Sequence, residues 1–468
     1  MTSAVKFNWF AWIAIVGLLP IAPVAAQQIS GGIQGAGTQQ IPGAARTTPG
    51  RPSALSFEQA IQLAIENNLQ TLLARERRNE ARGVKQQSLA ALLPNVSGVT
   101  YQASLTENLA ALGFQPGIIP GFNSTFVGPF RNFDARALLT QTIFNLSAIR
   151  NFQAGRAGVR VAELQEGLAR EQVASGTGLI YLEALRADAS VVAAQANVEL
   201  AQALLKLAQD QRNAGVATGV DVTRAQTRLA EQQVVLAQAQ TSSEQSRLNL
   251  QRVVGLPLGS SLTLTDRLRF AEEPLPAVEM AVAQAGQNRR EVQVAEEQNK
   301  VSRLERKAVR AEYVPSVELV GNYGVSGITP NREDLPTRSV AVQVNVPIFN
   351  GGLTRGRVTA AASRERQTEL ELSNVRGQVE EDVRLALTTL RTAAAQVRAA
   401  EESVMLAERE LEMARDRFRA GVGDNLEVVT AQTSLANARD ARVTALAQHN
   451  AARLNLAAAL GHAETFRW

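Results

Sequence analysis

An internal duplication constrains this chain more than any other feature of its sequence. The tetrapeptide Arg-Leu-Asn-Leu stands at 247–250 and again at 453–456, an offset of 206 residues. The same offset aligns Gly215 with Gly421, each inside an Ala-Gly-Val tripeptide. A fixed offset over much of a chain is the signature of a repeated structural unit. The chain is therefore predicted to fold as two copies of one unit.

The two copies differ in length between two landmarks. Upstream, Pro94 matches Pro315 at an offset of 221, whereas Ile143 matches Ile348 at an offset of 205. The first copy therefore carries 16 extra residues between these landmarks.

Each copy predicts the same order of elements: a helix, an extended segment, a loop, a second extended segment, a very long helix, a turn and a last helix. The helices are predicted over 55–92, 147–212, 220–254, 277–312, 353–419 and 425–460, and the extended segments over 95–105, 136–144, 316–326 and 339–346. Pro94, Pro315 and Pro347 fall where a helix meets a strand, because proline disrupts the interior of either element.

The two longest helices are predicted to be rods. At about 1.5 Å per residue each is about 100 Å long, more than a globular domain needs. Apolar residues follow a 4,3 spacing from Val379 to Val404 in the second copy, and the equivalent positions run from Val173 to Val198 in the first. This spacing is typical of a coiled coil. The alternative to the wall of a tube is an isolated coiled-coil dimer with no pore.

The extended segments alternate apolar and polar side chains, as strands with two different faces do. Val340, Val342 and Val344 alternate in the last segment, and Val99 and Tyr101 alternate in the first. The third segment is one residue out of phase with the first at the 221 offset, for which we expect a β-bulge. Each segment has about the length of a tilted transmembrane strand. A small soluble hairpin layer is the alternative.

Four strands do not close a membrane barrel, because the smallest such barrels have about eight and lipid does not tolerate open strand edges. If these strands enter a membrane, the chain must oligomerise. Three chains with four strands each would supply 12 strands, and six copies of the unit would surround the axis.

The N-terminus predicts a cleaved secretory signal. Lys6 precedes an apolar stretch over 7–19, and small residues end the segment at Ala26. About 13 apolar residues are too few for a transmembrane anchor, which needs about 20. The expected segments are a signal peptide at 1–26, a flexible leader at 27–53, the first copy at 54–255, a connector at 256–276, the second copy at 277–463 and a tail at 464–468.

Composition removes several chemistries. The chain has no Cys and two His, so it offers neither a thiolate nucleophile nor a three-histidine metal site. The sequence shows no catalytic triad order and no phosphate-binding glycine loop, so we expect neither enzymatic activity nor a cofactor. The 48 Lys and Arg nearly balance the 44 Asp and Glu and alternate with them along the helices, which argues against a nucleic-acid partner.

Three motifs follow one another along the duplicated unit. They are LSFEQAIQLAIENN at 55–68, VPIFNGG at 346–352 and RAGVGDNLEVVTAQTSL at 419–435. In this order they resemble the TolC-type outer-membrane efflux proteins, over roughly 53–463. The resemblance implies a mainly α fold with a small membrane β-barrel contribution: a homotrimer with a 12-stranded outer-membrane barrel and an α-helical periplasmic tunnel. It also implies three partners, which are a periplasmic adaptor, an inner-membrane pump and outer-membrane lipid.

The resemblance assigns roles to the turns between the long helices. It implies that the adaptor docks at Gly215 and Val216 in the first copy and at Gly421 and Val422 in the second. A glycine at these positions also fits the ordinary requirement of a helix end for a left-handed residue.

The resemblance further implies an acidic ring at the periplasmic entrance, formed by Asp221 and Glu427 just beyond the turns. The best-known members carry a second acid one helical turn later, where this chain has Thr430, and Asp424 is the candidate substitute. Acidic charge repeated around a constriction favours cations. Alternatively, an acid in the first turn of a helix simply complements the helix dipole.

The expected function is a passive exit duct of a tripartite efflux or type I secretion system, located in the outer membrane with a large periplasmic part. The alternative is a periplasmic coiled-coil adaptor or scaffold that does not conduct. The strands favour the duct, because an adaptor needs a β-rich domain and four isolated strand segments are too few for one.

Overall fold

The computed structural model describes residues 42–45, 54–113, 115, 124–272, 274–330 and 332–467. The predicted signal peptide and most of the predicted leader lie outside these residues.

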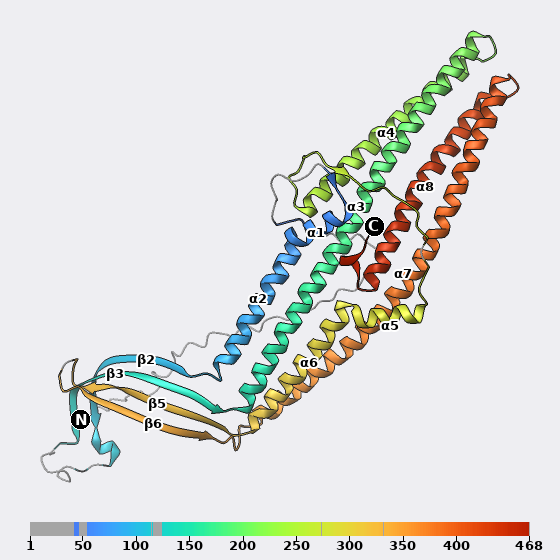
Figure 1. The fold of residues 1–468 in the computed structure, drawn as a ribbon. Coiled ribbons are helices and arrows are strands. Elements are labelled where there is room, and N and C mark those ends of the chain that lie inside the picture. The colour runs from blue at the N-terminus through green and yellow to red at the C-terminus, as the bar shows by residue number, and fades with distance from the viewer. Residues whose placement is uncertain are drawn as a thin grey trace, which may run out of the picture. The chain divides into compact units, whose positions relative to one another are not determined.

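The two copies have the same element order (Figure 1). The first contains α1 (Phe57–Asn67), α2 (Leu69–Ala90), β2 (Asn95–Asn108), β3 (Phe126–Phe144), α3 (Leu146–Asn213) and α4 (Gly219–Val254). The second contains α5 (Val278–Asn288), α6 (Arg290–Arg310), β5 (Ser316–Gly327), β6 (Leu335–Asn345), α7 (Leu353–Arg419) and α8 (Asn425–Ala459). The short strands β1 (Ala54–Leu55) and β4 (Thr263–Leu264) pair in parallel.

The single helices predicted over 55–92 and 277–312 are wrong, because each is two helices. The first breaks at Asn68 and the second at the equivalent Arg289. At these residues the backbone is extended, with ψ of 137° and 124°. The apolar periodicity runs on across both breaks, so it gave no signal of them.

Different side chains fix the two breaks. The Asn68 side chain is wholly buried, and its oxygen accepts a hydrogen bond from the Gln70 amide at 2.9 Å, which caps α2. The Arg289 guanidinium donates to the carboxylates of Glu291 at 3.0 Å and Asp382 at 3.1 Å. The same bend is therefore held by amide hydrogen bonding in the first copy and by ion pairs in the second.

The long strands form one antiparallel sheet in the order β2-β3-β5-β6. Asn95 pairs with Thr140, and Ser316 pairs with Asn345. These two pairs are equivalent at the 221 and 205 offsets, so the two hairpins share one register. The strands also extend past the predicted segments, and β3 begins ten residues before the expected 136.

The sheet has an apolar face, here called the valine face. It carries Val325 from β5, Val340, Val342 and Val344 from β6, and Ala135 and Leu139 from β3. The opposite face of these three strands is mainly polar and carries Asp134 and Arg136 from β3, Asn322 from β5, and Ser339 and Gln343 from β6. The exceptions are Gln141 and Arg338 on the valine face and Leu138 and Val320 on the opposite face.

The edge strand β2 reverses this polarity. Thr100 and Gln102 pair with β3 residues of the valine face, whereas Val99 and Tyr101 share the opposite face with Asp134. The pairing of β5 with β6 is continuous, and the register shift between β3 and β5 has its extra residue on β3, between Thr142 and Phe144, so the bulge expected in the third segment is wrong. The one-residue shift in the apolar pattern therefore reflects different side chains at equivalent positions, because the backbone register of the two hairpins is the same.

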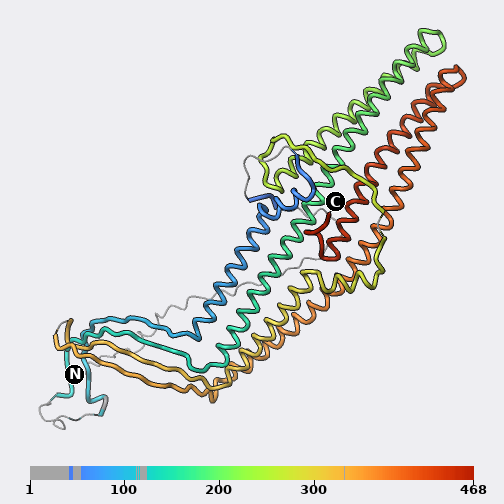
Figure 2. The backbone as a smooth tube through the Cα atoms, in the orientation of Figure 1, coloured from blue at the N-terminus to red at the C-terminus, as the bar shows by residue number. Residues whose placement is uncertain are grey.

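The predicted seam lies in the core of the helical layer. α3 packs against α2, α4 and α6, and α7 packs against α6 and α8. Val173, Val383 and Val397 on this seam are fully buried. α3 begins two residues after β3 and runs for 68 residues to its turn, so the sheet and the turns lie at opposite ends of it (Figure 2).

Within the described ranges, no helix has both the length and the apolar character of a membrane-spanning helix.

The connector packs on the first copy. The Asp266 carboxylate accepts hydrogen bonds from the Phe57 amide at 2.8 Å and the Tyr181 hydroxyl at 2.7 Å. Near the C-terminus, the Phe466 ring lies 5.7 Å from that of Phe57. These contacts fix the middle of the helical layer, between the sheet and the turns.

Candidate docking and entrance site at the helix turns

Two glycines shape the turns that follow α3 and α7. Gly215 and Gly421 have φ of 79° and 73°, a left-handed conformation that strains other residues. The next residues, Val216 and Val422, are 58% and 72% exposed. The two turns also touch, because a Cβ added to Gly421 would stand 3.4 Å from Cγ1 of Val216. The four predicted docking residues therefore lie on two adjoining turns.

Asp221 is engaged at the start of α4. It is only 9% exposed, and its carboxylate accepts hydrogen bonds from the Thr218 amide at 2.8 Å and the Thr218 hydroxyl at 2.7 Å. The carboxylate thus closes a capping box on the helix start. The hydrogen bond from the Thr218 hydroxyl is the main cause that lowers the pKa of Asp221, and Arg224 lowers it further.

The second copy distributes these roles differently. Asp424, equivalent to Thr218, caps α8 by accepting a hydrogen bond from the Leu426 amide at 3.1 Å. Glu427, equivalent to Asp221, forms an ion pair with Arg417 at 3.3 Å. The side chains of Asp424 and Glu427 are 62% and 47% exposed. Both carboxylates therefore present charge to solvent at the turn.

Polar contacts that the sequence did not indicate join the two turns. The buried Asn425 side chain donates a hydrogen bond to the Asp221 carbonyl at 2.8 Å. Arg224 lies 3.8 Å from the Asp221 carboxylate and 4.0 Å from that of Asp424. The sequence marks this place only by a difference between the copies, because Asn425 occupies the position that Gly219 has in the first copy. Its partner is 204 residues away, so spacing alone did not reveal the contact.

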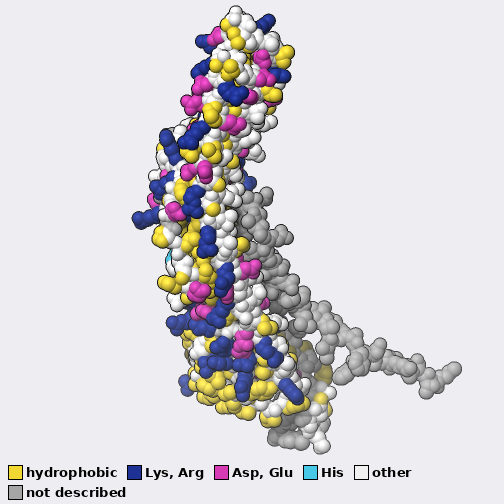
Figure 3. Space-filling model, turned by 90° about the vertical axis from the view of Figure 1, so that its right-hand side faces the viewer, with side chains coloured by type: hydrophobic (Ala, Val, Ile, Leu, Met, Phe, Trp, Pro, Cys, Tyr) yellow, Lys and Arg dark blue, Asp and Glu magenta, His cyan; other side chains and the backbone are white. Residues whose placement is uncertain are grey.

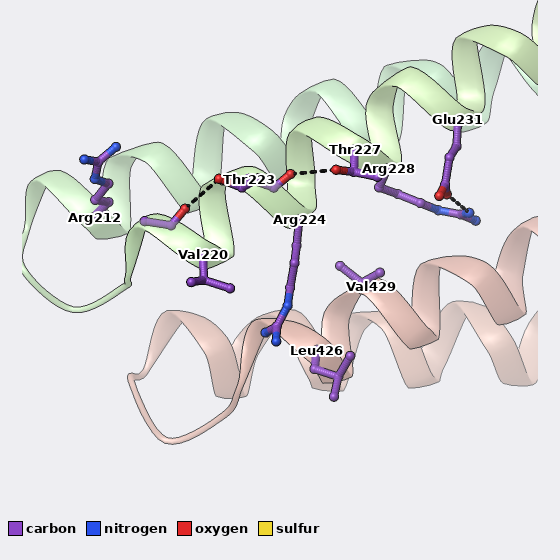
Figure 4. Close-up of a pocket in the computed structure, with 10 residues that line it drawn as sticks. Arg212, Val220, Thr223, Arg224, Thr227, Arg228, Glu231, Leu426 and Val429 are labelled. Carbon is purple, nitrogen blue, oxygen red and sulfur yellow. Dashed lines mark hydrogen bonds and ion pairs between the residues drawn. The ribbon is translucent and has the colours of Figure 1, made fainter.

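A groove of about 830 Å³ lies beside these contacts, between the first turns of α4 and α8 (Figure 4). Arg224 extends across it from α4 toward α8, where Leu426 and Val429 line the other side. Arg228 lines it farther along α4 and pairs with Glu231 at 3.0 Å. The groove thus combines apolar surface with arginine donors, a combination common where one protein docks on another.

The duplicated fold and these paired turns define a family. The sequence matches the profile of the outer membrane efflux protein family over residues 60–256 and 281–462. The chain belongs to this family. The two matched ranges correspond to the two copies of the duplicated unit, and the TolC-type resemblance is confirmed.

Individual relatives agree with this assignment. Alkaline protease secretion protein AprF of Pseudomonas aeruginosa is 26% identical over 407 residues, covering 82% of this chain and 80% of the relative. Proteases secretion protein PrtF of Dickeya chrysanthemi is 23% identical over 400 residues, covering 83% and 84%.

Solved structures show the same fold. The Campylobacter jejuni CmeC outer membrane channel aligns with a TM-score of 0.76 and 17% identity, covering 88% of this chain and 87% of CmeC. The open state of the Neisseria gonorrhoeae MtrE outer membrane channel aligns with a TM-score of 0.73 and 18% identity, covering 87% and 89%. The predicted mainly helical fold is thereby confirmed.

Proposed function

We propose that this chain is the outer-membrane exit duct of a tripartite efflux or type I secretion system. Its family supports this role, as do relatives named for protease secretion and for efflux, among them the probable efflux pump outer membrane protein TtgC of Pseudomonas putida. The duct conducts substrates passively and performs no chemistry of its own.

The observation that carries the proposal is the sheet. It has an apolar valine face, and within the described residues its edge strands β2 and β6 have no further partner. Backbone groups at an open edge are costly in lipid, so membrane insertion requires edges from sister chains. Three chains pairing β6 with the next β2 form a closed 12-stranded barrel. The helices then surround a periplasmic tunnel.

The turns are proposed to receive the periplasmic adaptor, which links the duct to an inner-membrane pump. Gly215, Val216, Gly421 and Val422 form the docking surface. The exposed valines and the adjoining groove supply apolar contact, and the arginines there supply directional hydrogen bonds.

The entrance is proposed to carry an acidic ring. Asp424 and Glu427 contribute exposed carboxylates, and Asp221 contributes a charge fixed by its hydrogen bonds. Threefold repetition places these charges around one axis, where they concentrate cations.

Planar-bilayer recording of the purified full-length protein tests the duct. We expect discrete current steps from protein that fractionates with the outer membrane as a trimer. A periplasmic adaptor or scaffold is the competing function, and it predicts soluble protein that gives no current steps.

Substitution of the turn glycine tests docking. Gly421→Leu should lower export by about tenfold or more, because it adds bulk at the centre of the docking surface. The measurement is export from cells, with trimer content as the check on assembly. Gly259→Leu is the matched control, because Gly259 has a similar φ of 81° but lies in the connector with open space around it. Equal export by both variants would exclude the turn as the docking point.

A further inference from the structure

Basic residues are concentrated where the helices adjoin the sheet. Segments 75–85, 150–160, 300–312 and 355–366 together contain 17 Lys and Arg against five Glu. The whole chain has 48 Lys and Arg and 44 Asp and Glu, so the rest of it carries 31 basic and 39 acidic residues. Figure 3 shows dark blue side chains gathered beside yellow ones at the lower end, where Figure 1 places the strands and adjoining helix ends.

The duplication repeats this arrangement. Arg150 in the first turns of α3 is equivalent to Arg355 in the first turn of α7, at the 205 offset. Lys85 near the end of α2 is likewise equivalent to Arg306 near the end of α6, at the 221 offset. Each copy therefore carries basic residues on both helices that leave its strand hairpin.

Several of these cations have no carboxylate to neutralise them. Glu365 forms ion pairs with Arg306 at 2.6 Å and with Arg303 at 3.7 Å, which accounts for two basic residues of α6. Lys307, Arg310 and Arg355 are exposed, and none forms an ion pair with a carboxylate among the residues that the structure describes. These groups are available to an external anion. Arg150 in the first copy is half-buried and donates to the Gln153 side chain at 2.8 Å, and it too forms no ion pair with a carboxylate among the described residues.

An exposed apolar pair lies beside the cations in both copies. Ile143 and Phe144 are 57% and 41% exposed at the end of β3, and Ile348 and Phe349 are 94% and 88% exposed after β6. In each copy an arginine follows seven residues after the isoleucine. Each copy therefore has an exposed isoleucine and phenylalanine followed by an arginine, at the junction between a strand and a long helix.

We propose that these two junctions bind anionic phospholipid in the periplasmic leaflet of the outer membrane. The Ile-Phe pairs contact acyl chains, and Arg150, Arg310 and Arg355 contact the phosphate. The proposal rests on the proposed function, which places the sheet in the bilayer. A headgroup layer is only about 5–8 Å deep, and one turn of helix rises about 5.4 Å. Basic residues in the turns nearest the strands therefore lie at headgroup depth.

The occupant must be amphiphilic, because the apolar pair and the cations adjoin. Exposed isoleucine and phenylalanine gain nothing from a purely polar polyanion, and lipid phosphate attracts nearby Arg and Lys. This combination selects an anionic lipid over free phosphate or peptidoglycan.

The test reconstitutes full-length trimers into nanodiscs of phosphatidylcholine mixed with phosphatidylglycerol and measures the phosphatidylglycerol retained after detergent extraction. The junction variant is Arg150→Gln with Arg310→Gln and Arg355→Gln, which removes the proposed phosphate contacts of both copies. The control is Arg391→Gln with Arg442→Gln, two exposed arginines of α7 and α8 outside the junctions. We expect wild type and control to enrich phosphatidylglycerol, and the junction variant to lose about tenfold of that preference. High salt should weaken the preference of the wild type.

Equal enrichment in the junction variant and wild type would overturn the proposal, as would an equal loss in both variants. The proposal would also be overturned if inorganic phosphate alone abolished the preference for phosphatidylglycerol. It would be overturned as well if the junction variant kept that preference and lost only its sedimentation with peptidoglycan sacculi. Conductance in phosphatidylcholine bilayers separates the two proposals. Current steps without lipid preference reject only the lipid site, whereas failure to insert or conduct rejects the duct.

Discussion

The two helix turns belong to two copies of one sequence unit, yet equivalent residues make different contacts in them. In the first copy Thr218 starts the helix and Asp221 holds the cap, with its carboxylate withdrawn from solvent. In the second copy Asp424 caps the helix itself, and Glu427 is released to pair with Arg417. A carboxylate at the cap position therefore frees the acid three residues later, and one local substitution redistributes charge at the turn.

The strand hairpins differ in a parallel way. Their register is the same, but β2 places Thr100 and Gln102 on the face where β6 places valines. Side-chain polarity has thus diverged while the backbone pairing has been retained, since the pairing rests on the hydrogen-bond ladder. Charged substitutions can separate these two properties.

The largest effect is expected on the valine face. Val342→Lys should destabilise the inserted chain by about 2–4 kcal/mol, the cost of a lysine facing the bilayer midplane. Gln102→Lys should cost less, because β2 already places a polar side chain on that face. The measurement is the yield of folded trimer in outer membranes. Ala341→Lys, on the opposite face of β6, is the control. Equal yields for Val342→Lys and Ala341→Lys would mean that the valine face does not contact lipid.

A smaller effect is expected from removing the two acids at the turns. Asp221→Ala should destabilise the start of α4 by about 1–2 kcal/mol, because it removes a buried cap. Glu427→Ala should cost below about 1 kcal/mol, because its ion pair is largely exposed. Hydrogen exchange of peptides over 214–226 and 420–432 measures both. Similar acceleration in the two variants would refute the division of roles.

Acid should loosen the first turn selectively. The folded pKa of Asp221 is lowered, mainly by the Thr218 hydroxyl hydrogen bond. A carboxylate with a lowered folded pKa stabilises the fold above its unfolded pKa, and this stability is lost as pH falls through the folded pKa. Opening of the α4 start should therefore increase below about pH 4. Hydrogen exchange of 214–226, referenced to 420–432 at each pH, measures it. Asp221→Asn should remove the dependence, and a persistent dependence in this variant would assign it to another group.

The smallest effect is expected on ion selectivity. Glu427→Gln should lower the cation preference of the channel by about threefold, because it removes exposed charge from the entrance. Asp221→Asn should lower it less, because that carboxylate is already engaged by Thr218. Reversal potentials in a salt gradient report the preference. A larger change for Asp221→Asn than for Glu427→Gln would show that the buried acid dominates the entrance field.

Much of the fold was predictable, because its determinants are periodic or duplicated. The helix expected over 353–419 is observed as Leu353–Arg419, since its apolar seam and flanking glycines mark both ends. The common register of the hairpins was implicit in the two offsets. The break at Arg289 was not predictable, because it depends on Asp382, which lies 93 residues away. Contacts between distant segments leave no local pattern.

The positions of the two helix turns were more predictable than the contacts within them. The glycines and the acids near them marked the turns correctly. The Thr218-x-x-Asp221 spacing is a local capping signal, so the engaged state of Asp221 was readable in principle. The bond from Asn425 to the Asp221 carbonyl was not, because it joins residues of different copies.

The breaks at Asn68 and Arg289 give the helical layer two bends at equivalent positions. The contacts that hold the two bends differ in chemistry. The first bend is held by hydrogen bonds of a neutral amide, which dissolved salt does not screen. The second is held by ion pairs of Arg289 with Glu291 and Asp382, which salt weakens. A rise in ionic strength therefore loosens one bend more than the other, so the duplicated halves respond unequally to the same environment.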